Sequence, residues 1–212
     1  SLLQTMTLEE RVGQMFIARF PEDGAIEEII NYNPGGYILF GNDFENETKD
    51  SILEKLQECQ NASKIKLVLG VDEEGGKVVR VSKYEAFCSS KFLSPQQIWV
   101  EGQLPAILKD STEKSNLLKS IGLNMNLTPV VDVPTDTSSY MYDRSYGRGA
   151  EKTSIYTEQL IKTMNNDDMV SVMKHFPGYG DNADTHIGVA VDERPYEVFE
   201  SSDFLPFISG IN

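Results

Sequence analysis

The residues Leu67-Val68-Leu69-Gly70-Val71 form an unbroken apolar run that ends at Asp72. A run without alternating polar positions is typical of a parallel strand that is covered on both faces of its sheet. Residues 48–62, immediately before it, place apolar side chains at helical spacing with charges on the remaining faces, which predicts an amphipathic helix. A helix that leads into a buried strand is the repeating unit of α/β proteins.

The same alternation extends in both directions along the chain. A capping-box pattern, Thr7 followed by Glu10, predicts the start of the first helix. Apolar periodicity and Gly, Pro and Asn breaks then predict the other elements. They are helices over residues 7–15, 25–31, 105–121 and 153–165, and strands over residues 16–20, 37–40, within 123–133 and over 170–173. With the run at 67–71, five β units are predicted.

Strands that are separated by helices pair in parallel, either in an open doubly wound sheet or in a closed barrel. The spacing of apolar residues does not distinguish an open sheet from a closed barrel. A (β/α)8 TIM-like barrel typically needs about 250 residues, and the chain has 212. The barrel interpretation therefore expects residues 1–212 to be the N-terminal part of a single barrel domain and to supply roughly its first five β/α units.

Charge and hydropathy narrow the range of partners. The chain has 33 acidic and 19 basic residues, a net charge of −14, which repels phosphate backbones and predicts no nucleic-acid partner. No segment reaches the roughly 20 apolar residues of a membrane span, and no signal pattern opens the chain. The compartment stays open between the cytoplasm and, if a signal or lipid anchor was trimmed, the cell envelope or the exterior.

The cysteine, methionine and aromatic side chains are expected to have structural rather than catalytic roles. Cys59 falls on the helix over 48–62 and is expected in the core, and Cys88 is expected in a loop. No Gly-x-Gly-x-x-Gly or phosphate-loop motif is present, so no cofactor is predicted. Core or pocket-wall positions are expected for Tyr37, Trp99, Met15, Met125, Met164 and Met173.

Three polar clusters follow predicted strands or lie in the long loops between elements, at residues 72–80, 143–147 and 174–186. Reactive groups of parallel α/β proteins collect at the carboxyl ends of strands. The third cluster is the most informative, because it holds both histidines of the chain, a lysine and two aspartates. Its glycines would let the loop close over a ligand.

Asp184 and His186 are two positions apart, a spacing at which a carboxylate in a turn can accept a hydrogen bond from the imidazole. Histidine, with a usual pKa of about 6.5, can donate a proton to a leaving group and later accept one from water. Taken alone, the pair favours the other interpretation, a turn aspartate beside a surface histidine, because structural roles for such residues are common.

Other charged residues in the clusters have two readings. Arg80 and Arg144 carry planar guanidinium groups that suit vicinal hydroxyls or carboxylates, and each could instead form a surface ion pair. Glu73 and Glu74 could be taken for a catalytic carboxylate pair. Neighbours in an extended segment point to opposite sides, so we assign both of them structural or supporting roles.

In this order the clusters resemble family three glycoside hydrolases, specifically the β-N-acetylglucosaminidase branch. The similarity runs from Leu8-Glu9-Glu10-Arg11-Val12-Gly13-Gln14-Met15 to Phe204-Leu205-Pro206-Phe207. Its most specific element is Lys174-His175-Phe176-Pro177-Gly178-x-Gly180 followed by Asp184-Thr185-His186. Val71-Asp72-Glu73-Glu74-Gly75-Gly76 with Arg80 is a second, less specific one.

The resemblance implies a retaining glycosidase that removes terminal β-linked N-acetylglucosamine from bacterial cell-wall fragments or chitin-like oligomers, as in peptidoglycan recycling. It makes His186, supported by Asp184, the general acid/base. Related β-glucosidases generally lack this Asp-x-His loop, although a β-glucosidase-type activity remains the alternative within the family. The sugar ring would be held by Asp72, Arg80, Arg144, Lys174 and His175.

Two features depart from the family pattern. Tyr179 stands where many members have a second histidine, which bears on fine specificity. The family's nucleophilic aspartate lies on a later strand with no counterpart in this chain, so the 212 residues are expected to supply the binding loops and the acid/base but not the nucleophile.

Two further hypotheses belong to other classes. A metal-dependent barrel hydrolase could use His175, Asp184 and His186 as ligands, although such sites generally want more nitrogen ligands. A non-catalytic carbohydrate-binding fragment would account for the missing nucleophile. Transfer of the sugar to phosphate in place of water also stays open.

Overall fold

A computed structural model describes residues 2–212 and shows five strands in one parallel sheet. The strands lie side by side in chain order, and each neighbouring pair is parallel. This arrangement confirms the predicted α/β class. The strands are β1 Ile17–Arg19, β2 Gly36–Leu39, β3 Val68–Val71, β4 Met125–Asn126 and β5 Val170–Ser171.

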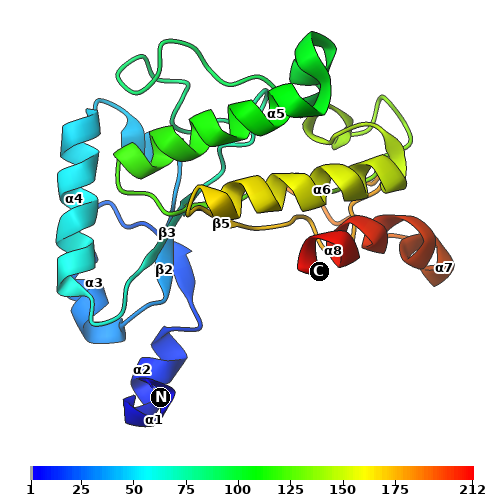
Figure 1. Ribbon diagram of the computed structural model, residues 1–212. Helices are drawn as coiled ribbons and strands as arrows, with labels where there is room; N and C mark the ends of the chain where they lie inside the picture. The colour runs from blue at the N-terminus through cyan, green and yellow to red at the C-terminus, as the bar shows by residue number, and fades with distance from the viewer. Residues whose placement is uncertain (1) are drawn as a thin grey trace.

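Helices alternate with these strands and carry the chain back for each parallel pairing, as Figure 1 shows. The principal ones are α2 Leu8–Gly13, α3 Ala25–Tyr32, α4 Lys49–Ala62, α5 Pro95–Ser120, α6 Gly149–Asn166 and α8 Phe204–Ile211. Shorter turns are α1 Leu2–Thr5, η1 Gly41–Phe44, η2 Tyr142–Arg144, α7 Tyr196–Val198 and the π-helical turn η3 Phe199–Asp203. None of the helices described for residues 2–212 is long and apolar enough to cross a membrane.

Local sequence signals account for the starts of α2 and α4. The Thr7 side chain accepts a hydrogen bond from the Glu10 amide while the Glu10 carboxylate accepts one from the Thr7 amide, which confirms the predicted capping box. Thr48 caps α4 by accepting from the amide of Ser51. The buried face of α4 includes Cys59, as predicted.

Helix α5 differs from its prediction over 105–121. It begins ten residues earlier, after Ser94, whose hydroxyl accepts from the Gln97 amide in a second capping box. A kink at Gly102 and Gln103, where the backbone leaves helical geometry, divides α5 into two segments. The prediction covered the second of them, in which Pro105 lies in the first turn and needs no hydrogen bond from its nitrogen.

The core lies between the sheet and the helices that cover it. Tyr37, Met125 and Met164 are buried, as predicted, and Trp99 is partly buried against the core with its ring on Tyr146. The prediction for Met15 is wrong, because 82% of this residue is exposed. It lies in the turn between α2 and β1, beyond the end of the helix that had been predicted over residues 7–15.

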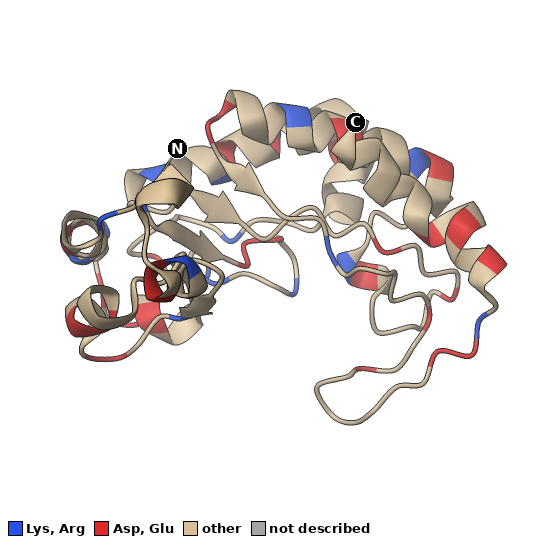
Figure 2. Ribbon diagram, turned by 90° about the horizontal axis from the view of Figure 1, so that it is seen from below, with Lys and Arg blue, Asp and Glu red and all other residues tan. Residues whose placement is uncertain are grey.

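The loops that follow the strands carry most of the buried charge. The longest of them connects β5 to α7 and projects away from the sheet in Figure 2, where it forms the excursion at the lower right. This loop contains the sequence from Lys174 to His186. The loops after β3 and β4 end at the same edge of the sheet, because parallel strands point the same way.

Candidate active site

The loop after β3 is organised by Glu73, whose carboxylate is fully buried. It accepts hydrogen bonds from the amides of Arg80 and Val81 at 2.8 Å and from the amide and hydroxyl of Ser82. A buried carboxylate needs such donors to offset the loss of water. Glu73 therefore folds the loop back on itself and turns Glu74 to the other side, as the alternation of extended residues predicted.

Glu74 binds two cations from distant parts of the chain. Its carboxylate is bonded by Arg144 through Nε at 3.0 Å and Nη2 at 2.8 Å, and it lies 2.6 Å from the Lys174 Nζ. Burial by itself raises the pKa of Glu74, but the bonds from Arg144 and the charge of Lys174 outweigh burial and lower the pKa below its usual value. Lys174 also donates to Asp72 at 2.5 Å. The four side chains form one cluster at the ends of β3 and β5.

Exposure separates the members of this cluster. The side chains of Asp72 and Lys174 are 17% and 12% exposed, whereas that of Glu74 is 3% exposed. Asp72 and Lys174 can therefore reach a ligand from the open side. Glu74 lies behind them and sets the positions of Lys174 and Arg144.

Arg144, in η2, joins the cluster to an aromatic neighbour. Its Nη1 donates to the Tyr140 hydroxyl at 3.2 Å, and its Nη2 lies 3.3 Å from Nε2 of His175. The surface ion pair that was the alternative reading for Arg144 is wrong, since its side chain is 9% exposed and holds a buried carboxylate. Its guanidinium group ties the loop after β4 to the loops after β3 and β5.

Sequence reasoning missed Asp132, a fully buried carboxylate in the loop after β4. It lies 2.7 Å from Nδ1 of His175 and accepts the His175 amide. It also accepts the amide of Tyr179 at 2.8 Å. Asp132 follows the apolar pair Val130-Val131, which is the same signal that drew attention to Asp72 after Val71. With Nδ1–H donating to Asp132, Nε2 of His175 faces Arg144 as an acceptor.

Asp184 and His186 do form a pair. Nδ1 of His186 lies 2.6 Å from Oδ1 of Asp184, which also accepts the His186 amide at 2.9 Å. These two bonds lower the pKa of Asp184 and keep it ionised. The His186 side chain is 77% exposed, and its ring centroid lies 6.3 Å from that of Tyr140. Arg144 also lies against Tyr140, with its Cζ 5.6 Å from the ring centroid, so this tyrosine neighbours both Arg144 and His186.

Arg80 is not joined to the ion-pair cluster. Its amide is held by Glu73, and its Nε is buried without a hydrogen-bond partner in the part of the chain that the structure describes. A buried guanidinium donor without a partner is costly, so Arg80 is a group that a polar ligand would satisfy.

The loop from Lys174 to Arg194 is fastened at several points. The Asp181 carboxylate accepts the amides of Thr135 and Asp136 at 2.9 Å and the Thr135 hydroxyl at 2.6 Å. Arg194 donates to the buried Asp203 and to the Gly178 carbonyl, both at 3.0 Å. These bonds attach the loop to the loop after β4 and to η3, and they leave His186 on the segment between them.

The residues named in the metal hypothesis do not converge. Within residues 2–212 the structure contains no group of three or more His, Cys, Asp or Glu side chains arranged to hold a metal ion. His175 is held by Asp132, whereas His186 is held by Asp184 on the outer part of the loop.

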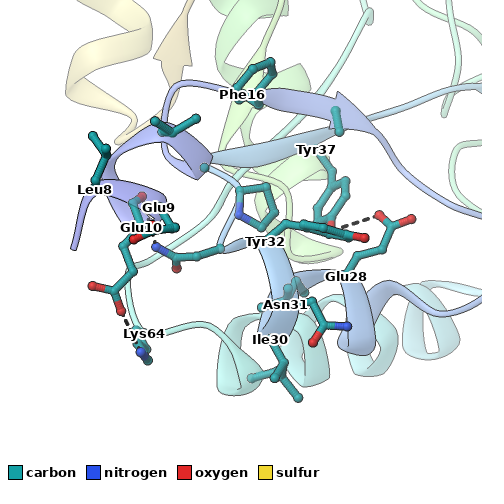
Figure 3. Close-up of a pocket in the computed structure, with 17 residues that line it drawn as sticks. Leu8, Glu9, Glu10, Phe16, Glu28, Ile30, Asn31, Tyr32, Tyr37 and Lys64 are labelled. Carbon is teal, nitrogen blue, oxygen red and sulfur yellow. Dashed lines mark hydrogen bonds and ion pairs between the residues drawn. The ribbon is translucent and has the colours of Figure 1, made fainter. Parts of the chain in front are cut away.

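A groove of about 780 Å³ lies at the opposite end of the sheet and is shown in Figure 3. Apolar side chains of α2, of α3 and of the segment leading into β1, among them Leu8, Ile30 and Phe16, line most of it. Glu10 pairs with Lys64 at its rim at 2.6 Å. Helix α2 and the end of α3 come just before β1 and β2 in the chain, so the groove lies at the amino ends of these strands. It is therefore separate from the polar cluster at the carboxyl ends of the strands.

Five parallel strands that lie side by side in chain order, with buried charges beyond their carboxyl ends, place this chain among the parallel α/β proteins and are the arrangement expected of part of a (β/α) barrel. The chain matches the Glycosyl hydrolase family 3 N terminal domain over residues 7–212 and belongs to this family. The predicted resemblance is therefore confirmed at the level of the family.

Relatives agree with this assignment. The Beta-hexosaminidase of Xylella fastidiosa (strain M12) is 30% identical over 184 residues, which cover 83% of this chain and 52% of the relative. The Beta-hexosaminidase A of Pseudoalteromonas piscicida is 29% identical over 85% of this chain and 31% of its own length. The chain thus spans about half the length of the first relative and about a third of the second.

Solved structures of the family share the fold. A glycoside hydrolase family 3 beta-N-acetylglucosaminidase from Paenibacillus sp. str. FPU-7 superposes with a TM-score of 0.86 at 23% identity, over 98% of this chain and 40% of that one. Native NagZ from Neisseria gonorrhoeae gives a TM-score of 0.77 at 26% identity, over 92% of this chain and 57% of that one. These superpositions confirm the predicted fold, a family barrel of which this chain supplies the first five units.

Proposed function

We propose that this chain belongs to a retaining β-N-acetylglucosaminidase that removes terminal β-linked N-acetylglucosamine from cell-wall or chitin-like oligosaccharides. The family supports glycoside cleavage, and relatives named beta-hexosaminidase support the amino sugar. One observation carries the proposal: the 2.6 Å bond between Nδ1 of His186 and Asp184.

This bond decides which nitrogen of the ring exchanges protons. An ionised carboxylate accepts only, so Nδ1 keeps its proton in both charge states of the imidazole. Nε2 is then the atom that gains and loses a proton. Because the ring is mostly exposed and carried by a loop, Nε2 can approach a glycosidic oxygen above the buried cluster.

In the first step, Nε2–H gives its proton to the glycosidic oxygen as the bond from C1 to that oxygen breaks. A carboxylate supplied from outside residues 1–212 forms the bond to C1. In the second step, Nε2 takes a proton from water while the water oxygen replaces the carboxylate on C1. Two displacements return the β configuration, as in other retaining glycosidases.

The sugar is held in this proposal by the members of the cluster that are open to a ligand. Asp72 accepts from sugar hydroxyls, and Lys174 and His175 lie beside it on the open side. Arg144 contributes from behind them, and the partly exposed Arg80, outside the cluster, presents its guanidinium group to the ligand.

The test is hydrolysis of an aryl N-acetyl-β-glucosaminide by the full-length protein. His186→Ala should lower kcat by about 10²–10⁴, the usual contribution of general acid/base catalysis. Glu193→Ala, a change at an exposed position of the same loop, should leave kcat near the wild-type value.

The calorimetric affinity for N-acetylglucosamine should persist in His186→Ala. Binding without turnover by the wild type would support the non-catalytic alternative, and an unchanged rate in His186→Ala would contradict the proposal. Products analysed with and without phosphate would separate hydrolysis from transfer to phosphate.

A further inference from the structure

Tyr179 stands between the sugar-binding cluster and the Asp184–His186 pair. Its amide donates to Asp132 at 2.8 Å, and its ring packs edge-on against His175 with centroids 5.8 Å apart. Asp132 also holds His175, so the backbone of Tyr179 is fixed to the same buried carboxylate as one of the binding residues.

The other end of Tyr179 reaches the loop segment that carries Asp184. Its hydroxyl lies 3.1 Å from the Ala183 carbonyl, 2.8 Å from the Thr185 amide and 3.0 Å from the Thr185 hydroxyl. A phenol has one proton and two lone pairs. The proton can go to Ala183 while the oxygen accepts from both Thr185 groups, which uses the full bonding capacity of the hydroxyl.

We infer that Tyr179 is a positioning residue for proton transfer, which fixes the Asp184–His186 pair relative to the bound sugar. Its hydroxyl bonds the residues on either side of Asp184, and its amide is bonded to the carboxylate that orients His175. The inference rests on the proposed function, in which His186 is the acid/base.

The surroundings explain why such a contact is needed. Beyond His186 the loop is open, with Ile187 85% and Val189 96% exposed. The bonds of Asp181 and Arg194 hold the ends of the loop but not its middle. An acid/base must lie within hydrogen-bond reach of the proton that it transfers, so the tyrosine supplies a constraint that the anchors do not.

The first experiment measures the contact itself. Tyr179→Phe keeps the ring and removes the hydroxyl that accepts the Thr185 amide. Amide hydrogen exchange at Thr185 should then become about tenfold faster, because the loss of one hydrogen bond typically changes the local opening equilibrium by about that factor. Tyr196→Phe, which removes an exposed phenol on α7, should leave Thr185 exchange unchanged. Unchanged exchange in Tyr179→Phe would overturn the inference whether or not the protein is active.

The second experiment asks whether the contact serves proton transfer. A phenyl leaving group needs a proton from the enzyme, whereas a dinitrophenolate departs without one. Tyr179→Phe should therefore lower kcat/KM about tenfold for phenyl N-acetyl-β-glucosaminide and less than about threefold for the dinitrophenyl compound. In a His186→Ala background, Tyr179→Phe should cause no further loss, because the two residues act as one unit.

The outcomes separate the two proposals. A wild-type protein that cleaves neither substrate contradicts the proposed function, and Thr185 exchange still decides whether the contact exists. An active wild type with equal losses on both substrates in Tyr179→Phe overturns the positioning role and leaves the glycosidase proposal intact.

Discussion

Replacement of Glu74 by glutamine tests whether the buried cluster is held together by one carboxylate. Glu74→Gln keeps the size of the side chain and removes its charge. Arg144 then loses its bidentate carboxylate partner, and Asp72 is the carboxylate that remains paired with Lys174. The amide that replaces one carboxylate oxygen also presents N–H groups to cations that can only donate.

The expected loss of stability follows from the geometry. Removing one partner of a buried ion pair typically costs about 3–5 kcal/mol. The remaining amide oxygen can still accept one hydrogen bond, worth about 1 kcal/mol. We therefore expect Glu74→Gln to lower the free energy of unfolding by about 3 kcal/mol, roughly a hundredfold shift toward the unfolded state.

Urea unfolding of the full-length protein, followed by circular dichroism, measures this loss. Glu85→Gln removes a charge from an exposed glutamate in the same long loop and should change stability by less than about 0.5 kcal/mol. A double-mutant cycle with Arg144→Gln should recover at least about 1 kcal/mol, because the second substitution removes a cation that the first had left unpaired. A loss below about 1 kcal/mol in Glu74→Gln, or purely additive effects in the cycle, would refute the central role of this carboxylate.

Two further predictions concern other parts of the structure. Gly36→Ala should destabilise the protein by about 1–3 kcal/mol in the same unfolding assay, because an added Cβ would lie 1.9 Å from a backbone oxygen of β3. The control is Gly188→Ala, whose added Cβ would meet nothing within 4 Å and should leave stability unchanged. Arg194 lowers the pKa of Asp192 to about 2, below its unfolded value of 3.8. The pair should therefore contribute stability above about pH 4 and lose it as the pH falls toward 2. Asp192→Asn should cost about 1 kcal/mol at pH 7, a value discounted for solvent screening, and much less at pH 2, as unfolding at the two pH values would show.

Most of the fold could be predicted from local patterns. The continuous apolar run before Asp72 became β3, and the helical periodicity before it became α4, because both signals are set by residues close in sequence. The first segment of α5 was missed although Ser94 and Gln97 carry a capping box followed by helix-compatible residues. Gly102 interrupted the apolar periodicity there, and periodicity does not continue through a kink.

The site was predictable to the extent that its residues follow strands. Asp72 directly follows β3 and Lys174 lies shortly after β5, and their side chains do meet, as the rule for parallel sheets predicts. The partners of these side chains were not predictable, because the pairs join residues that are far apart in the sequence. Glu74 and Arg144 are 70 positions apart, and Asp132 and His175 are 43 apart. The short length of β4 also hid Asp132, since only two residues of that region pair as a strand.

The residues that would hold the sugar and the residue that would transfer a proton differ in their burial. The groups that would hold the sugar are fixed by buried carboxylates, Glu74 and Asp132, and have little freedom to move. The group that would move a proton lies on an exposed loop, where the ring can reach both a leaving group and water. Such an arrangement works only if the loop is constrained relative to the rigid part. Of the contacts described here, those of Tyr179 are the ones that join Asp132 to the residues flanking Asp184. In the proposed mechanism, the precision of proton transfer therefore depends on Tyr179.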